Sequence, residues 1–239
     1  MTPSAVQAEP DYASSFYLDH ESAAVGDFVE RALVGCSPTD SARAVALYYA
    51  VRDGIFYEVY GIDVSPQGLR ASSIVRSGKG FCVHKCVLYA AALRRAGIAS
   101  RLVLCQVRNH LASPRLLELV GGETFLHWMT QVRLHDRWIS VTPVFNKLLC
   151  TMYGIEALDF DGQADCLEHP YLAGERMEIL DWMGEYSDFP YEEFLRRSQI
   201  LHPLLIIGPS TATGGGLISE APGSSSKSNS RGAARQVRT

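Results

Sequence analysis

The apolar positions of the chain follow helical spacing in its first third. Residues 21–33 and 39–53 carry apolar side chains three and four positions apart, and Ser37-Pro38-Thr39 is a start signal for the second segment. Residues 80–96 also predict a helix, ended by Gly97. The first three turns of this helix are apolar nearly all the way round, which is typical of a helix buried at the centre of a domain.

The middle of the chain has strand-like patterns instead. Residues 100–107 are rich in Leu and Val, residues 125–134 alternate between apolar and polar, and residues 137–141 follow a His135-Asp136 turn. A last helix is predicted over residues 191–202. Helices kept apart from an antiparallel meander predict an α+β domain with a central helix packed on the sheet.

Composition and charge divide the chain into two parts. With 239 residues, 47% of them apolar, the chain can form one domain with a sizeable core. Residues 208–239 are rich in Gly and Ser, have no aromatic residue, and contain four basic residues against one acidic residue. We expect residues 1–207 to form the domain and residues 208–239 to be a disordered basic tail. The domain is then more acidic than the net charge of −4 indicates.

Several functional classes are disfavoured. An acidic body argues against binding of nucleic acid through a basic face. The sequence has no run of 18 apolar residues, and its first residues lack the pattern of a signal peptide, so we expect a soluble cytoplasmic protein without a membrane partner. Because no Walker or dinucleotide motif occurs, we expect no cofactor.

The six cysteines do not form a disulfide pattern. There is no CxxC pair, and without a secretion signal we expect reduced thiols, most of them buried. The spacing Cys82-x-His84-x-Cys86 is compatible with zinc, but side chains two apart on one helix diverge, so we expect no metal site. We expect Cys86 in the core and His84 towards solvent or a neighbouring helix.

Cys82 differs from the other cysteines in its position. The run Ser77-Gly78-Lys79-Gly80-Phe81 leads directly into the central helix, and Cys82 lies in its first turn. Unpaired backbone N–H groups and the helix dipole favour a thiolate there, so its pKa can fall far enough for a nucleophile near neutral pH. The glycines would let a substrate carbonyl approach the backbone.

A nucleophilic thiol needs a base, and His127 is the leading candidate. It lies in the alternating run 125–134, on the same face as Phe125, Met129 and Gln131. A histidine among inward-facing apolar residues is more often a satisfied core residue than a base. Trp128 is expected to face the other way and to pack in the core.

These motifs together resemble the transglutaminase-like superfamily, whose papain-like core uses Cys, His and Asp. The order is Gly80-Phe81-Cys82, then Ala96-Gly97-Ile98, then His127, then Arg137-Trp138. The resemblance covers roughly residues 48–146 and is closest to a bacterial branch. It implies a papain-like fold, with Cys82 as the nucleophile and His127 as the general base.

The sequence departs from the family at the third residue. The family has Asp four residues after the strand Trp, whereas here Thr142 follows Trp138 at that spacing. A hydroxyl can fix the imidazole tautomer but cannot stabilise imidazolium as a carboxylate does. Three residues could orient His127: Thr142 itself, Asn146, or Asn109 from the preceding strand. We favour Asn109 slightly, because papain-like enzymes use Asn for this role.

The resemblance implies a cysteine-dependent acyl-transfer enzyme that forms a thioester on Cys82. The substrate would be a peptide amide or an acyl thioester, including one held by a carrier protein. Attack by water, by an amine or by an internal carbanion would give hydrolysis, transamidation or Dieckmann-type cyclisation. An alternative of another class is a catalytically inactive binding module, which the loss of the usual Asp motivates.

Overall fold

The computed structural model describes residues 10–108, 112–167 and 177–221. The helices are α1 (Ala23–Ala32), α2 (Asp40–Gly54), α3 (Ala71–Ser77), α4 (Cys82–Arg95), α5 (Pro114–Val120), α6 (Lys147–Tyr153), α7 (Tyr191–Leu201) and α8 (Leu217–Glu220). The main strands are β3 (Ser100–Arg108), β4 (Thr124–Leu134), β5 (Arg137–Val141) and β6 (Glu178–Tyr186). The short strands are β1 (Phe56–Tyr57), β2 (Lys79–Gly80), β7 (Ile206–Ile207) and β8 (Ser210–Thr211).

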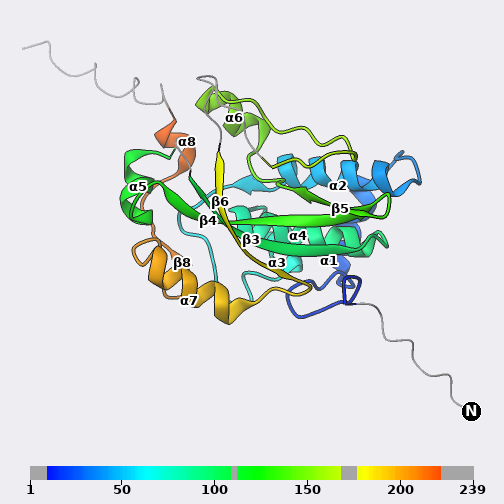
Figure 1. Cartoon of the computed structure of the whole chain (residues 1–239), viewed down its shortest axis with the longest axis horizontal. Helices are drawn as coiled ribbons and strands as arrows, with labels where there is room; N and C mark the ends of the chain where they lie inside the picture. The colour runs from blue at the N-terminus through cyan, green and yellow to red at the C-terminus, as the bar shows by residue number, and fades with distance from the viewer. Residues whose placement is uncertain (1–9, 109–111, 168–176, 222–239) are drawn as a thin grey trace, which may run out of the picture.

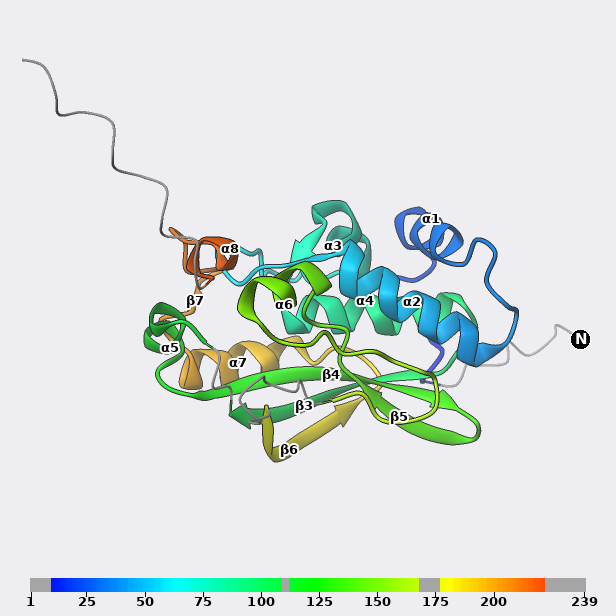
Figure 2. The ribbon, with the colours of Figure 1, turned by 90° about the horizontal axis from the view of Figure 1, so that it is seen from above.

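The main sheet is antiparallel and has the order β5-β4-β3-β6. Figure 2 shows helices α1 to α4 on one side of this sheet, where they cover one of its two faces. The predicted α+β class with a central helix on an antiparallel sheet is therefore confirmed. Strand β6 was not expected, because most of its residues are exposed and its register against β3 shifts twice, so the alternation of apolar residues is lost.

The central helix α4 is buried along nearly its whole length, from Cys82 to Arg94. It packs on the face of β3, β4 and β5 that carries Leu104, Trp128 and Val141. The predicted buried helix is confirmed, although it begins at Cys82 because the extended backbone of Phe81 forms its N-cap. The intervening residues of the strands, Val103 and Met129 among them, form a smaller apolar cluster on the opposite face.

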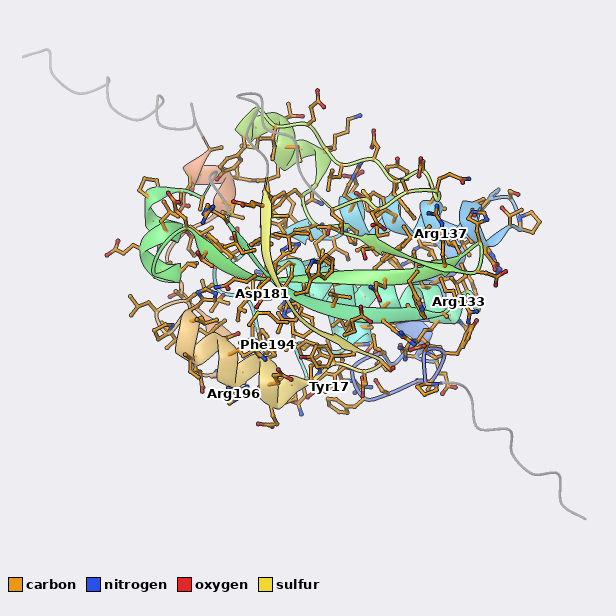
Figure 3. All side chains as sticks on the ribbon, viewed as in Figure 1. Tyr17, Arg133, Arg137, Asp181, Phe194 and Arg196 are labelled. Carbon is orange, nitrogen blue, oxygen red and sulfur yellow. The ribbon has the colours of Figure 1, made fainter. Side chains whose placement is uncertain are left out.

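Helix α7 lies on the same side of the sheet as α4 and covers the part of that face that α4 leaves free. Phe194 points towards the sheet, where its ring contacts that of Trp128, and Arg196 points outwards (Figure 3). The far end of the β4–β5 hairpin carries Arg133 and Arg137, which Figure 3 shows well away from α7. Trp128 is therefore a core residue, as its alternation predicted.

The predicted domain boundary at residue 207 is wrong for residues 208–221. Strand β8 pairs with β7, the backbone N–H of Thr211 donates to the carbonyl of Ile62, and Leu217 is buried. Backbone hydrogen bonds and a few buried side chains such as Leu217 hold this segment in place. A Gly- and Ser-rich composition does not reveal such contacts, so the prediction of disorder failed here. The rest of the predicted tail, 222–239, lies outside the described residues. Among the helices described, none is long and apolar enough to cross a bilayer.

Candidate active site

Two glycines bring the chain into α4. Gly78 ends α3 in the left-handed conformation, with a φ of 65°. A Cβ at Gly80 would lie 2.5 Å from the Cβ of His84, so only glycine allows this strand to cross the first turn of the helix. The expectation that the glycines let a substrate carbonyl approach the backbone is therefore wrong for Gly80, where His84 fills that space, whereas a Cβ at Gly78 would meet nothing within 4 Å.

The thiol of Cys82 is buried at the start of α4. Burial in apolar surroundings raises its pKa to about 11, although hydrogen bonds from backbone groups of Trp128, Val83 and Cys82 itself act in the opposite direction. The expected lowering of the pKa is therefore wrong, since the desolvation of a thiolate outweighs the N-terminal N–H groups. The bond with Trp128 brings the thiol to the backbone that directly follows His127.

Two other thiols hold the backbone on which His127 lies. The Sγ of Cys105 donates to the carbonyl of His127 at 3.5 Å, and the Sγ of Cys86 donates to that of Trp128 at 3.1 Å. Thr130 in turn donates its hydroxyl to the carbonyl of Cys86 at 3.1 Å. Because these contacts come from β3 and α4, they fix His127 relative to the helix that carries Cys82.

His202 supports the same strand one residue earlier. The backbone N–H of Leu126 donates to its Nε2 at 3.1 Å, so Nδ1 carries the hydrogen and donates to the carbonyl of Val120 at 2.9 Å. Burial lowers the pKa of His202, which keeps the ring neutral. The sequence gives no signal for His202, because its partners are backbone groups far away in the chain.

The two predicted residues Cys82 and His127 line one cavity of about 100 Å³. It forms where β5 leaves β4: the pairing ends at Thr130 and Val141, so the start of β4 has no neighbour on that side. Phe145, Leu149 and Tyr153, from the chain that continues into α6, line this gap. Residues of α5, α7 and α8 complete the wall. Figure 1 shows these three helices at one end of the molecule.

The residues predicted to orient His127 have different surroundings. Thr142 is buried, yet its hydroxyl has no hydrogen-bond partner among the described residues, and Thr142 does not line the cavity. Asn109 lies outside the described residues. The role of either one towards His127 stays a prediction.

Asn146 is fully engaged elsewhere. Its amide oxygen accepts from the backbone N–H of Tyr57 at 2.6 Å, and its amide nitrogen donates to the carbonyls of Arg52 and Ile55. The Nζ of Lys85 donates to the same two carbonyls at 2.8 and 2.7 Å. This buried cluster fixes the end of α2 and the approach to Tyr57, a cavity residue, so Asn146 is not available to reach His127.

The Cys82-x-His84-x-Cys86 spacing does not gather a metal site. The ring of His84 is buried, and its Nε2 lies 2.9 Å from the carbonyl of Asp63, so the expectation that His84 faces solvent or a neighbouring helix is wrong. Burial lowers the pKa of His84 to about 4. Within the described ranges, no three His, Cys, Asp or Glu side chains are arranged to hold a metal ion.

Comparison with known proteins agrees with this architecture. A family model of the transglutaminase-like superfamily matches residues 27–143, which include Cys82, His127 and Thr142. Residues 27–143 therefore carry the core of the transglutaminase-like superfamily. At the level of the family, this match supports a cysteine-dependent enzyme.

Other comparisons add little about activity. No curated protein matches the chain. Among solved structures it is similar to one from Cytophaga hutchinsonii described as a "putative cysteine protease", with 13% identity and a TM-score of 0.45. The alignment covers 75% of this chain and 46% of that chain, so this chain spans less than half the length of that one. A likeness of this size supports no argument about the reaction.

Proposed function

We propose that the protein is a cysteine-dependent acyl-transfer enzyme in which Cys82 is the nucleophile and His127 the general base. The observation that carries the proposal is that both side chains line one cavity. Covalent acyl transfer needs a nucleophile and a base that come within hydrogen-bond reach of each other, and their placement at the wall of a common pocket is the first condition for this.

The first step forms a bond between the Sγ of Cys82 and the carbonyl carbon of an amide or thioester. The thiol proton passes to His127 and from there to the departing amine or thiol as the old bond breaks. Because burial raises the pKa of Cys82 to about 11, the resting thiol keeps its proton. His127 therefore removes this proton during the attack, in the manner of a serine enzyme, and not beforehand.

A second acceptor then releases the acyl group. Cys82 and His127 are each only 6% exposed, so bulk water has little access to a thioester between them. This low exposure favours attack by a carbanion within the acyl chain, the Dieckmann-type cyclisation, as a second candidate beside hydrolysis and transamidation. A carrier protein is the partner that such a cyclase would use.

The test is intact-mass detection of an acyl adduct after mixing the protein with acyl thioesters and with peptide amides. We expect an adduct on Cys82, and we expect Cys82→Ala or His127→Ala to lower turnover by at least about a thousandfold. Cys150→Ala and His135→Ala are matched controls, because neither residue lines the cavity, and both should retain turnover. Full turnover by Cys82→Ala would overturn the proposed role of Cys82. Absence of both an adduct and turnover in the unmodified protein would leave the inactive binding module.

A further inference from the structure

We infer that the cavity beside Cys82 receives an uncharged, apolar acyl group, and that Leu217 of α8 sets the length it accepts. This inference rests on the proposed function, because it names the substrate class of the same site. It depends on the chemistry of the cavity wall and on the contacts of a segment that we call the C-terminal strap, residues 213–221.

The wall of the cavity is apolar. None of the described residues that line it carries a charged side chain, and aromatic and aliphatic residues such as Phe81, Phe125, Phe145 and Leu149 form most of it. A charged acyl group would therefore be buried there without a partner, which is strongly unfavourable. Each methylene that fits should instead raise kcat/KM about fourfold through burial.

Three polar side chains on the wall already have partners. The hydroxyl of Tyr153 donates to the carbonyl of Leu217 at 2.8 Å, and that of Ser113 donates to the carboxylate of Glu220 at 2.5 Å. The two ring nitrogens of His202 bond to the backbone, as described above. A polar substrate group that paired with one of these three side chains would have to break its bond, whereas an apolar group leaves all of them intact.

The C-terminal strap contributes Leu217 to the cavity wall. Helix α8 lies beside α5 and α6 in both Figure 1 and Figure 2. The backbone N–H of Leu217 donates to the carboxylate of Glu58 at 3.4 Å, and its carbonyl accepts from Tyr153. Both bonds involve the backbone, so they fix where the Leu217 side chain enters the cavity wall without depending on its size.

Further polar contacts anchor the rest of the strap. The carboxylate of Glu220 accepts from the hydroxyl of Tyr60 at 3.0 Å as well as from Ser113. The guanidinium of Arg115 donates to the carbonyls of Thr213, at 3.0 Å, and Gly214. Shortening the Leu217 side chain should therefore lengthen the cavity while the strap stays attached.

The experiment measures acylation of Cys82 by N-acetylcysteamine thioesters whose straight acyl chains grow from two to twelve carbons. Succinyl thioester, which ends in a carboxylate, is compared with butyryl thioester of the same length. We expect the succinyl compound to react at least about tenfold more slowly. We expect Leu217→Ala to move the optimal length up by about three carbons, the number that the substitution removes. Ile218→Ala is the matched control, because Ile218 is 40% exposed and does not line the cavity.

A binding measurement separates this inference from the proposed function. The Cys82→Ala variant cannot be acylated, so calorimetry with hexanamide, and with its analogue ending in a carboxylate, reports on the cavity alone. The inference is supported if hexanamide binds more tightly than the carboxylate analogue, and if Leu217→Ala changes this binding while Ile218→Ala does not. This result holds even if no thioester reacts with Cys82. Acylation without preference for uncharged chains, or equal effects of Leu217→Ala and Ile218→Ala, would overturn it and leave the proposed function intact.

Discussion

The Sγ of Cys86 donates a hydrogen bond to the carbonyl of Trp128 at 3.1 Å and so joins the second turn of α4 to the strand that carries His127. Cys86→Ala removes this bond and leaves a small cavity in the core. We expect the free energy of unfolding to fall by about 1–2 kcal/mol, while turnover changes less than tenfold. Urea denaturation and steady-state kinetics measure the two effects. A loss of turnover as deep as that of Cys82→Ala would mean that Cys86 takes part in the chemistry.

The reactivity of Cys82 in the free protein should follow its raised pKa. At pH 7 we expect iodoacetamide to alkylate Cys82 about 100-fold more slowly than an ordinary thiol, with a rate that still rises towards pH 11. Mass spectrometry of the digested protein gives the rate for each cysteine, with the partly exposed Cys36 as an internal reference. Rapid alkylation of Cys82 at pH 6 would instead indicate a preformed thiolate.

The same pKa makes stability depend on pH. The folded state prefers the neutral thiol, so the contribution of Cys82 is complete below pH 9 and is lost as the pH rises towards 11. We expect the wild-type protein to lose up to about 3 kcal/mol more than Cys82→Ser over this window. Chemical denaturation of both proteins at a series of pH values tests this, and parallel curves would contradict it.

Gly80→Ala should disturb the start of α4. The new Cβ would overlap the Cβ of His84, whose position is fixed by the helix backbone and which cannot turn away, so we expect a loss of about 1–3 kcal/mol. Gly54→Ala, where a Cβ would meet open space, is the control and should be close to neutral. If both variants unfold at the same denaturant concentration, the close approach of Gly80 to His84 does not exist in solution.

Thr142→Val should stabilise the protein. It replaces a buried hydroxyl that has no hydrogen-bond partner among the described residues with a methyl group of similar shape, so we expect a gain of about 1 kcal/mol. Turnover should stay within a few fold if another residue orients His127. A large fall in turnover together with unchanged stability would assign that role to Thr142.

The segments with strong apolar periodicity could be predicted from the sequence. Helix α4 and strands β4 and β5 occur where the pattern puts them, because α4 is buried nearly all the way round and the two strands carry continuous runs of buried residues. Strand β6 and helix α8 could not be found this way. Backbone pairing holds β6, and α8 depends on Glu58, Tyr60 and Tyr153, which lie far away in the chain.

Only part of the candidate site could likewise be predicted from the sequence. The helix-start position of Cys82 is visible in the sequence, because the glycines and the helix follow one another directly. Its raised pKa is not, since desolvation depends on the cavity, and the cavity brings together residues as distant as Tyr57, Leu126 and Leu217. His202 escaped notice for the same reason: backbone groups from two other segments determine its tautomer.

The attachment of the C-terminal strap has a consequence for how this site can change. Leu217 belongs to the same apolar core as residues of α4 and β4, but polar contacts hold the strap, so a smaller side chain at Leu217 leaves these attachments in place. Selectivity for acyl length could therefore diverge between homologous proteins while the chemistry at Cys82 stays the same. A protein shortened to Ile207 would keep the nucleophile and the base, but it would open the cavity to water.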